Sequence, residues 1–327
     1  MSDVKKILIT GESGFIGSHL IKHFVFKYPH YIIHGLDSLT YASNKDLTKD
    51  LIAKPNYFFQ KIDIRNRHEV LDFFINHQIS DVIHLAAESH VDNSIANPLI
   101  FAETNILGTI NLLDGFKQVS SGRFHHVSTD EVYGDLDIND RPFDENFAYA
   151  PNSPYSASKA SSDHFVRAYY KTYGLDSVIT NCSNNYGPHQ HEEKFIPTII
   201  MSILNNHSIP IYGEGNNIRD WLYVQDHVEA LDIVFHNGSK GETYNIGANN
   251  EISNLDLVHH ICNICVEKKY HSNPKKLISF VADRLGHDKR YAINYSKIQE
   301  QLSWRPKFDF QTALESTIDW YATNFQS

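Results

Sequence analysis

Short apolar runs alternate with longer stretches of helical period through the first 187 residues of the chain. The first run, Lys6–Thr10, is followed by a helical pattern from about Phe15 to Phe26 and by a second run from Tyr31 to Asp37. Such alternation is typical of α/β proteins, in which helices cover both faces of a parallel sheet. The same rhythm predicts further strands at 57–64, 81–87, 123–129 and 177–182, and helices near 67–77, 98–117 and 157–173.

The pattern changes after Tyr186, where proline and glycine interrupt the chain more often. Short strands then mix with helical patterns near 194–205, 226–236 and 253–268. We therefore expect a doubly wound parallel sheet in residues 1–187 and a smaller mixed α/β domain, mainly in residues 188–327. A segment near 221–247 is expected to return to the first domain.

Composition places the chain among ordinary globular proteins. Of its 327 residues, 41% are hydrophobic and 21% are charged, which argues against a disordered chain. The net charge of −10 argues against a nucleic-acid partner held by a broad basic surface. With three cysteines, no long apolar span and no signal-peptide pattern, we expect a cytoplasmic protein without a membrane partner.

A glycine-rich turn joins the first predicted strand to the first predicted helix. Gly11, Gly14 and Gly17 would let the backbone approach a pyrophosphate at a helix N-terminus, which carries a partial positive charge. Asp37 ends the second strand, where its carboxylate can accept hydrogen bonds from the ribose hydroxyls of adenosine. Because Ser38 and Leu39 bring no cation for a ribose phosphate, the pattern favours NAD over NADP in a Rossmann-type fold.

The ends of the other predicted strands supply further candidates for the cofactor site, since an open α/β sheet binds ligands at the carboxyl ends of its strands. Asp63 and Ile64 are candidates for the adenine end of the cofactor. Ordinary packing explains Ile64, and the alanines Ala86 and Ala87 named below, equally well. The remaining candidates are Phe15 and Ile16 in the turn, Leu85, Ala86 and Ala87 after the fourth strand, and Ser128 in the fifth.

Tyr155 and Lys159 are four residues apart, so they share one face of a predicted helix. Tyr155 is distinguished by the Ser128–Glu131 segment upstream, which ends the fifth strand. Beside Lys159 and an oxidised nicotinamide, the pKa of Tyr155 would be lowered, and Thr129 could hold the same sugar hydroxyl. Spacing alone does not identify this pair, because two other pairs have the same spacing: Tyr41 with Lys45, and Tyr57 with Lys61.

Asp130 and Glu131 are adjacent carboxyl groups at the predicted end of the fifth strand. Two such groups can serve as an acid and a base when their surroundings separate their pKa values. For an arbitrary Asp-Glu pair, a solvated turn would be the better interpretation. The position beside Thr129 favours chemistry instead.

Together these residues resemble the extended short-chain dehydrogenase/reductase superfamily and, within it, the dTDP-glucose 4,6-dehydratase family. The resemblance covers nearly the whole chain. GESGFIGSHL and PYSASKA are shared across the superfamily, whereas STDEVYG and the DRLGHDKRY stretch are more specific to the dehydratases.

The resemblance implies that bound NAD oxidises sugar carbon 4, with Tyr155 as the base, and later returns hydride to carbon 6. It also implies that Glu131 removes the carbon 5 proton while Asp130 protonates the departing hydroxyl. Glu88 and His90 are expected near the sugar. The implied substrate-binding residues are Ser89, Thr104, Asn184, Lys194, Arg219, Asn254, Arg284 and His287.

Several alternatives stay open. A UDP-glucose 4,6-dehydratase fits the same residues, and a UDP-sugar 4-epimerase needs Tyr155, Lys159 and NAD but no paired acids. A UDP-glucuronate decarboxylase usually has serine where Asp130 stands. An inactive NAD-sensing protein is a further alternative, disfavoured because Thr129, Tyr155 and Lys159 are all present. A homodimer, built through the helices near 98–117 and 157–173, is expected by family likeness.

Other signals carry less weight, and some positions depart from the family pattern. Cys262 and Cys265 are interpreted as buried apolar residues. Residues 189–193 are not expected to form a metal site. Three departures concern local geometry: Glu12 in the glycine turn, Asn181 where arginine is frequent, and Leu285 where proline is common.

Overall fold

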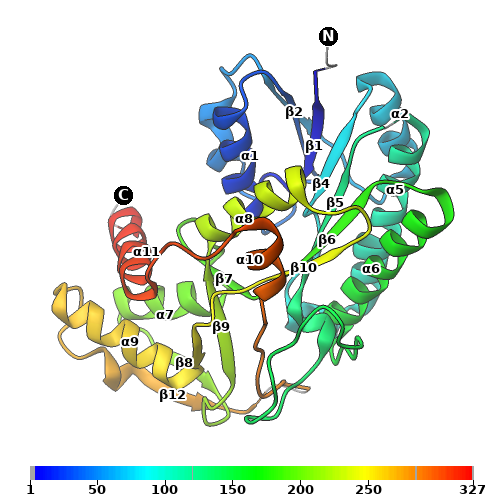
Figure 1. Cartoon of the computed structure of the whole chain (residues 1–327). Coiled ribbons are helices and arrows are strands. Elements are labelled where there is room, and N and C mark those ends of the chain that lie inside the picture. Colours follow the sequence, from blue (N-terminus) through cyan, green and yellow to red (C-terminus); the bar gives the residue numbers. More distant parts are fainter. Residues whose placement is uncertain (1–3, 120, 284–285, 326–327) are drawn as a thin grey trace.

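A seven-stranded parallel sheet forms the centre of the larger part of the molecule (Figure 1). The computed structural model describes residues 4–119, 121–283 and 286–325. The strands lie in the order β3-β2-β1-β4-β5-β6-β10. From β1, the chain first adds strands on the side of β2 and then on the side of β4, as in dinucleotide-binding sheets. The strands are β1 (Lys6–Thr10), β2 (Ile32–Asp37), β3 (Tyr57–Lys61), β4 (Asp81–His84), β5 (Phe124–Thr129), β6 (Ser177–Cys182) and β10 (Thr243–Ile246).

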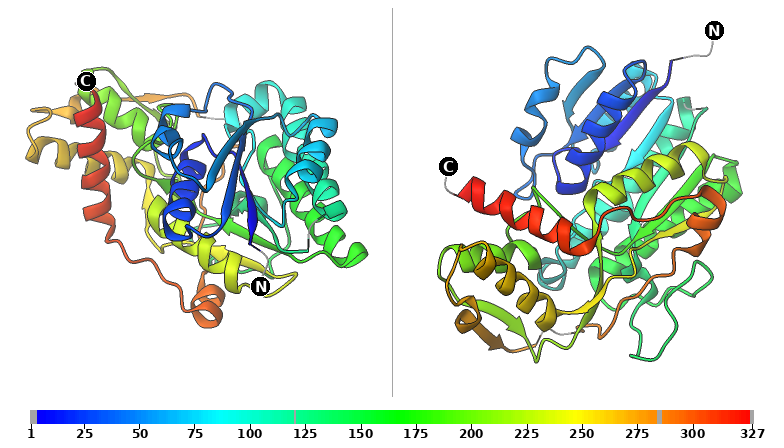
Figure 2. Two further views of the ribbon diagram at one scale, coloured as in Figure 1. Left: turned by 90° about the horizontal axis from the view of Figure 1, so that it is seen from above. Right: turned by 60° about the vertical axis from the view of Figure 1, so that its left-hand side comes forward.

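Helices cover both faces of this sheet, which the view from above in Figure 2 shows. One face packs against α1 (Phe15–Lys27) and α8 (Val224–Asn237). The opposite face packs against α2 (Arg67–His77), α5 (Gly108–Val119) and α6 (Pro154–Tyr173). Because both faces are covered, the strands β1, β5 and β6 are almost completely buried, and the expected doubly wound parallel sheet is confirmed.

The smaller part has its own apolar core, below the large sheet in Figure 1. Two small sheets support it: β7 (Asn184–Tyr186), β9 (Ile218–Tyr223) and β11 (Glu251–Ser253) form one, and β8 (Ile209–Tyr212) and β12 (Ile278–Val281) the other. Three helices pack on them, namely α7 (Phe195–Leu204), α9 (Asn254–Glu267) and α11 (Phe310–Phe325).

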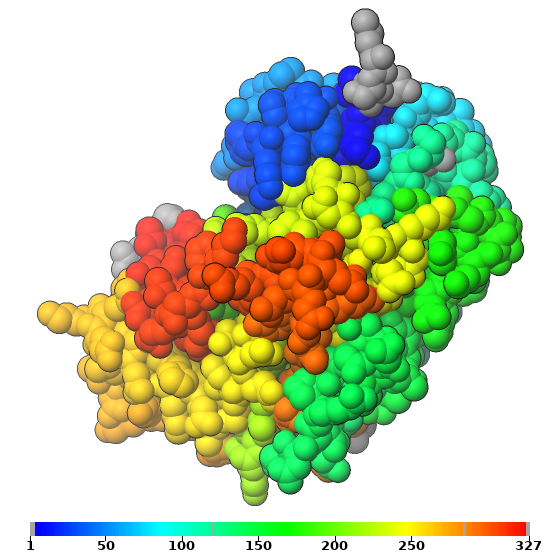
Figure 3. Space-filling view, in the orientation of Figure 1, coloured from blue at the N-terminus to red at the C-terminus, as the bar shows by residue number. Residues whose placement is uncertain are grey.

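The C-terminal segment connects the two parts. In Figure 3 it runs, orange to red, across the middle of the molecule. Its helix α10 (Ser296–Leu302) packs on β10 and α8 of the large sheet, while Phe143 and Ile293 form an isolated bridge. The backbone N–H of Lys307 donates to Asp226 on α8 over 2.8 Å.

Most predicted elements agree with the structure, and the main differences are at the carboxyl ends of two strands and in the helix predicted at 98–117. β3 ends at Lys61 and β4 at His84, three residues earlier than expected in each case. The predicted helix 98–117 is built from α4 (Pro98–Phe101), the π-helix η2 (Ala102–Leu107) and α5. The remaining elements are α3 (Val91–Ala96) and the 3₁₀ turns η1 (Lys45–Leu51), η3 (Asp130–Tyr133) and η4 (Pro274–Leu277). Among the described helices, none is long and apolar enough to cross a membrane.

Candidate active site

A pocket of about 330 Å³ lies where the carboxyl ends of β1, β2, β4 and β5 meet the smaller part. This volume is within the range of small-molecule sites. The pocket brings together residues at the carboxyl ends of β1 to β6 and residues of α6, as expected for an open α/β sheet. The sequence-predicted residues that line it are Gly11, Gly14, Phe15, Ile16, Gly17, Asp37, Asp63, Ile64, Leu85, Ala86, Ala87, Ser89, Thr104, Ser128, Thr129, Asp130, Glu131, Tyr155, Lys159, Asn184 and Lys194.

The glycine-rich turn approaches the neighbouring backbone too closely for any side chain. Gly11 has a φ of +71°, and a Cβ atom there would lie 2.8 Å from the backbone nitrogen of Ala86. A Cβ atom on Gly17 would lie 1.9 Å from the carbonyl oxygen of Gly11. Gly14 caps α1 without a side-chain hydrogen bond, so this helix N-terminus can present its N–H groups to an anion.

Glu12 points away from this turn and into the protein, between β2 and β3. It is fully buried, and its carboxyl accepts hydrogen bonds from Tyr57 at 2.8 Å and from Ser13 at 3.0 Å. Burial raises the pKa of Glu12, and the nearby Asp37 adds to the increase. A Cβ atom on Gly35 would lie 2.8 Å from Glu12, so the glycine in β2 makes room for the acid.

Asp37 organises the two loops around the end of β2. Its Oδ2 accepts from the backbone N–H of Ser13 at 3.0 Å. Its Oδ1 accepts from the N–H of Leu39 at 2.7 Å and from the Ser43 hydroxyl at 2.8 Å. Asp63, at the end of β3, pairs with Arg65 through contacts of 2.6 to 3.1 Å, so this pocket-lining guanidinium is already matched by a carboxylate.

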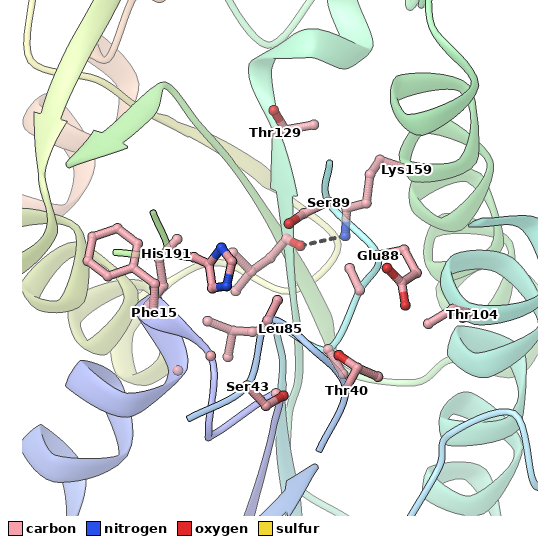
Figure 4. Close-up of a pocket in the computed structure, with 18 of the residues that line it drawn as sticks. Phe15, Thr40, Ser43, Leu85, Glu88, Ser89, Thr104, Thr129, Lys159 and His191 are labelled. Atoms are coloured by element: carbon pink, nitrogen blue, oxygen red, sulfur yellow. Dashed lines mark hydrogen bonds between the residues drawn. The ribbon is translucent and has the colours of Figure 1, made fainter. Parts of the chain in front are cut away.

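Helix α6 places Tyr155 and Lys159 on the face that meets β5. Ser153 begins the helix with a capping box shared with Ser156, and Pro154 occupies its first turn. Lys159 is 4% exposed, and its Nζ donates to the carbonyl oxygen of Val127 at 2.8 Å. In Figure 4, Lys159 and Thr129 lie at one end of the pocket and Ser43 and Thr40 at the other.

Thr129, Asp130 and Glu131 follow one another at the end of β5 and have different surroundings. Asp130 is 1% exposed, whereas Glu131 is only partly buried. The hydroxyl of Thr129 donates to Asp130 at 3.4 Å and accepts from the backbone N–H of Glu131 at 3.3 Å. Burial raises the pKa of Asp130 well above its usual value, with contributions from Glu131 and Asp220. Burial therefore favours the protonated form of Asp130.

The protein's own groups raise the pKa of Tyr155, so the lowering expected beside an oxidised nicotinamide stays a prediction. Burial raises the pKa of this phenol well above its usual value, and Glu131 is the next largest cause, while a hydrogen bond with Thr129 acts in the opposite direction. Burial also lowers the pKa of Lys159, although Asp163 opposes that change. The groups of the protein alone therefore keep Tyr155 protonated, and its ionisation depends on a positive charge at the cofactor's nicotinamide position.

The wall opposite β5 is built from the loop after β4 and from η2. The side chain of Asn105 accepts from the backbone N–H of Glu88 at 2.9 Å and donates to the Glu88 carbonyl at 3.0 Å. Its amide also donates to the Ser158 hydroxyl at 2.8 Å, which links the wall to α6. From the other side of the pocket, Lys194 Nζ donates to the carbonyl oxygen of Ser89 at 3.0 Å. Glu88 lines the pocket as expected, and His90 Nε2 lies 4.0 Å from the pocket-lining Glu193.

Of the remaining predicted substrate residues, Arg219, Asn254 and His287 do not line this pocket. Arg219 lies over the ring of Tyr291 at 4.3 Å, donates to the Asp288 carbonyl at 2.9 Å, and acts electrostatically on Asp130. Asn254 begins α9, and His287 pairs with Asp283 at 2.7 Å. Arg284 lies outside the described residues, as does Leu285. Their roles toward a substrate stay predictions.

The competing signals in the sequence have structural roles in the described chain. Tyr57 donates to Glu12, and Tyr41 contacts Glu193 and Asn93 rather than the end of β5. Asn181 is fully buried and donates to the hydroxyls of Tyr133 at 3.0 Å and Tyr149 at 3.2 Å. Cys262 and Cys265 lie on α9 and are buried in the core, which confirms their interpretation as apolar residues. Within the described residues, no cluster of His, Cys, Asp or Glu could hold a metal ion.

Sequence reasoning missed the loops that close the pocket. Most of the missed residues lie outside regular strands and belong to no periodic pattern, whereas Leu36, Val127, Cys182 and Asn185 lie within strands. One available signal was the string of polar residues directly after β2 and β7. The missed residues that line the pocket are Leu36, Ser38, Thr40, Ala42, Ser43, Ile62, Arg65, Val127, Cys182, Ser183, Asn185, Gln190, His191 and Glu193.

Comparison with known proteins identifies dehydratases that are similar to this chain. Residues 8–317 match the family described as GDP-mannose 4,6 dehydratase. A dTDP-glucose 4,6-dehydratase of Salmonella typhimurium is 48% identical, over 98% of this chain and 94% of that protein. The crystal structure of the dTDP-glucose 4,6-dehydratase DesIV from Streptomyces venezuelae, with NAD bound, superposes with a TM-score of 0.92, 40% identity and 98% coverage of both chains.

A more distant likeness links the chain to the epimerases. The structure of a UDP-glucose 4-epimerase from Thermotoga maritima, determined with UDP-glucose, has a TM-score of 0.89 and 26% identity, with 98% of this chain and 99% of that chain covered. The family match spans nearly the whole chain and the dehydratase relatives are far more similar in sequence. The chain therefore belongs to the GDP-mannose 4,6 dehydratase family of extended short-chain dehydrogenases/reductases.

Proposed function

We propose that the protein is an NAD-dependent dTDP-glucose 4,6-dehydratase, which converts dTDP-glucose to dTDP-4-keto-6-deoxyglucose and water. One observation carries this proposal: Asp130 is buried, which raises its pKa, and it lies beside the half-buried Glu131 at the strand end that faces Tyr155. An elimination of water needs one group that gives a proton and another that accepts one. A simple 4-epimerisation would need neither.

The residues of the pocket fit NAD. The glycine turn, which leaves no room for a Cβ atom, and the N-terminus of α1 would hold the pyrophosphate. Asp37 would hold the adenosine ribose, and Tyr155 and Lys159 would lie at the nicotinamide end. Bound NAD would supply the oxidising chemistry, accepting hydride from sugar carbon 4 and returning it to carbon 6.

The first step assigned to the chain's own residues is proton removal from the hydroxyl on sugar carbon 4. Tyr155 would accept this proton, and Thr129, in hydrogen-bonding contact with Tyr155, would orient the hydroxyl. Lys159 would stabilise the phenolate through its positive charge. The loss of hydride and of this proton leaves a ketone at carbon 4.

The second step is elimination. The ketone makes the neighbouring proton on carbon 5 acidic, and Glu131 would accept it. Asp130 would give its proton to the hydroxyl on carbon 6, which leaves as water. The raised pKa of Asp130 is what a proton donor at neutral pH requires. Return of a proton from Glu131 to carbon 5 and of hydride to carbon 6 completes the 4-keto-6-deoxy sugar.

The choice of nucleotide rests on the relatives. Proteins named dTDP-glucose 4,6-dehydratase are 46 to 48% identical to this chain over 98% of its length. UDP-glucose is the second candidate substrate, because thymine and uracil differ by one methyl group. A 4-epimerase is the second candidate reaction, supported by the structural likeness at 26% identity and by the shared Tyr155 and Lys159.

Product analysis with isotope-labelled substrate tests the proposal. The purified protein is incubated with dTDP-glucose and, separately, with UDP-glucose, each deuterated at carbon 4, and the products are identified by NMR. Deuterium at carbon 6 of a 4-keto-6-deoxy sugar supports the dehydratase. Deuterium retained at carbon 4 of an inverted sugar identifies an epimerase, and no turnover of either sugar contradicts both.

We also propose that the protein is a homodimer that works in the cytoplasm. Exposed apolar side chains on α3, α4, η2 and α6, elements that pack on one another, support the dimer: Ile95, Leu99, Leu107 and Phe165. The three cysteines, all buried and none in a disulfide, support a reducing compartment.

A further inference from the structure

A buried carboxyl group, Asp163, lies one helical turn after Lys159 on α6. Tyr155, Lys159 and Asp163 follow one another at intervals of four residues, so all three lie on the face of the helix that packs on β5. Asp163 is 0% exposed. No step assigned above uses this group, although a buried carboxyl is costly for the fold unless it is matched by charges or hydrogen bonds.

Side chains from two other elements hold this carboxyl. The Ser128 hydroxyl donates to Asp163 Oδ2 at 3.0 Å, and His126 Nε2 lies 3.1 Å from Asp163 Oδ1. His126 and Ser128 are two residues apart on β5, so they point to the same face of the sheet. The hydroxyl of Tyr149, in the segment before α6, forms a further hydrogen bond with Asp163.

Lys159 is attached to the same stretch of β5. Its Nζ donates to the carbonyl oxygen of Val127, the residue between His126 and Ser128. The lysine and the carboxyl thus fix α6 to three consecutive residues of the strand. Thr129 follows directly, so these two attachments also set the position of Tyr155 relative to Thr129.

The charge of Lys159 needs a partner because its burial disfavours the ammonium form. Among the groups acting on Lys159, Asp163 is the largest influence that favours the charged form. Cys182 acts in the same direction, but burial raises the pKa of that thiol to about 12, so it carries no charge at neutral pH. The counter-charge for the lysine therefore comes from Asp163.

We propose that Asp163 is a positioning residue for the oxidation step: its carboxylate, held by the Ser128 hydroxyl, keeps Lys159 charged beside Tyr155. This inference rests on the proposed function, because it assigns Asp163 a part in the proton removal by Tyr155. Asp163 itself does not touch the substrate.

The pH range in which the proposal can be tested follows from the groups around Asp163. Burial raises the pKa of Asp163 to about 6, so the carboxylate is lost as the pH falls through about 6. Burial lowers the pKa of His126 and of the neighbouring His84 well below the usual value, so both stay neutral there. The other titratable groups acting on or bonded to Asp163 are Lys159 and His164 on α6, Tyr149 before α6, and Tyr133 in η3.

The principal experiment measures NAD reduction in a single turnover of the NAD-loaded enzyme with dTDP-glucose, from about pH 5 to about pH 9. Asp163→Asn keeps the shape of the side chain and removes its charge. We expect this variant to reduce NAD about 10- to 100-fold more slowly with little change in KM, because a tenfold change corresponds to one pKa unit of lost support for the ammonium group. The decline of the rate near pH 6 should also disappear. A wild-type rate and pH profile in this variant would overturn the proposal.

A second variant keeps the proposal testable if Asp163→Asn does not fold. Ser128→Ala removes one hydrogen bond to the carboxylate and leaves its charge, so the decline of the rate should move to higher pH. An unchanged pH for this decline would contradict the proposal. Asp232→Asn is the matched control: it is a buried acid on α8 bonded to His23 and Lys27, and its loss should lower stability without altering the pH profile.

The outcome is separable from the fate of the proposed function. The wild-type enzyme is assayed in the same series for the 4-keto-6-deoxy product. If the wild type reduces NAD with dTDP-glucose but forms another product, the dehydratase assignment fails while the test of Asp163 remains valid. If it forms the product and the two variants behave as the wild type does, the inference about Asp163 fails alone.

Discussion

Two adjacent carboxyl groups at the end of β5 show how position changes the chemistry of a residue. The Asp130 side chain is buried against Thr129 and near Asp220, whereas Glu131 is exposed to part of the pocket. Burial penalises the charged form, so the pKa of Asp130 rises and its protonated form is favoured. A single step along the backbone thus separates a group suited to donate a proton from a neighbour suited to accept one.

Tyr155→Phe should abolish the oxidation step, because the phenyl ring cannot accept the proton of the sugar hydroxyl. We expect the rate of NAD reduction by dTDP-glucose to fall at least about 100-fold, a usual cost of losing a general base. Cofactor content, measured by absorbance after denaturation, should stay at the wild-type value. Near-normal NAD reduction in this variant would remove Tyr155 from its assigned role.

Glu131→Gln should separate the two halves of the reaction. NAD reduction should persist, because Tyr155 and Lys159 are intact, while loss of the acceptor should slow elimination about 100-fold or more. Reduced cofactor should therefore accumulate with a sugar that is oxidised at carbon 4 and still carries its carbon 6 hydroxyl, as mass spectrometry can show. An equal loss of both steps would contradict the division of labour.

At the scale of elements, the regular parts of the site were predictable and the irregular parts were not. The spacing of apolar residues located β1, α2 and β6 at their observed bounds. The proposed catalytic residues were identifiable in the sequence because they lie at the end of one strand and on the first turns of one helix. The π-helical turn η2 was not foreseen, since its widened backbone has no apolar period of its own.

The loops of the site were harder still to predict, for a physical reason. His191 and Glu193 reach the pocket only because the chain after β7 folds back over the end of the large sheet. Their placement depends on contacts between segments far apart in sequence, such as Lys194 with Ser89 and Tyr41 with Glu193. No local pattern records such contacts.

The buried Glu12 in the glycine-rich turn should make the stability of the protein depend on pH. Its pKa is raised by burial, so the folded protein retains a proton that the unfolded chain loses above about pH 4.5. Stability should therefore fall as the pH rises through the raised pKa of Glu12. Glu12→Gln should remove this loss, so its effect on the free energy of unfolding should be more favourable at pH 8 than at pH 4.5.

Thermal and urea unfolding at both pH values measure this effect. Tyr57→Phe provides a matched change in the opposite direction, because it removes the hydroxyl that donates to the Glu12 carboxylate. Its destabilisation should be larger at pH 8 than at pH 4.5. Identical pH dependence in the wild type and Glu12→Gln would show that this carboxyl does not titrate as its burial implies.

At the scale of the whole molecule, the cofactor face and the exposed apolar face share the same elements. η2 carries Thr104 into the pocket and Asn105 onto the Glu88 loop, while Leu107 of the same turn is 53% exposed. Leu99 on the preceding α4 is 64% exposed. A second copy of the chain that covers these side chains would therefore stabilise η2, which forms part of the pocket wall.

The oligomeric state tests this arrangement. The wild type should sediment as a dimer, and the double change Leu99→Glu with Leu107→Glu should shift it to the monomer, because two buried carboxylates would oppose association. Ile138→Glu is the control: this residue is 72% exposed but lies in the segment after η3, so the dimer should persist. If the monomeric double variant also loses turnover while it keeps its NAD, the dimer contributes to catalysis through η2. A wild type that sediments as a monomer at micromolar concentration would instead leave the apolar face without a second copy of this chain.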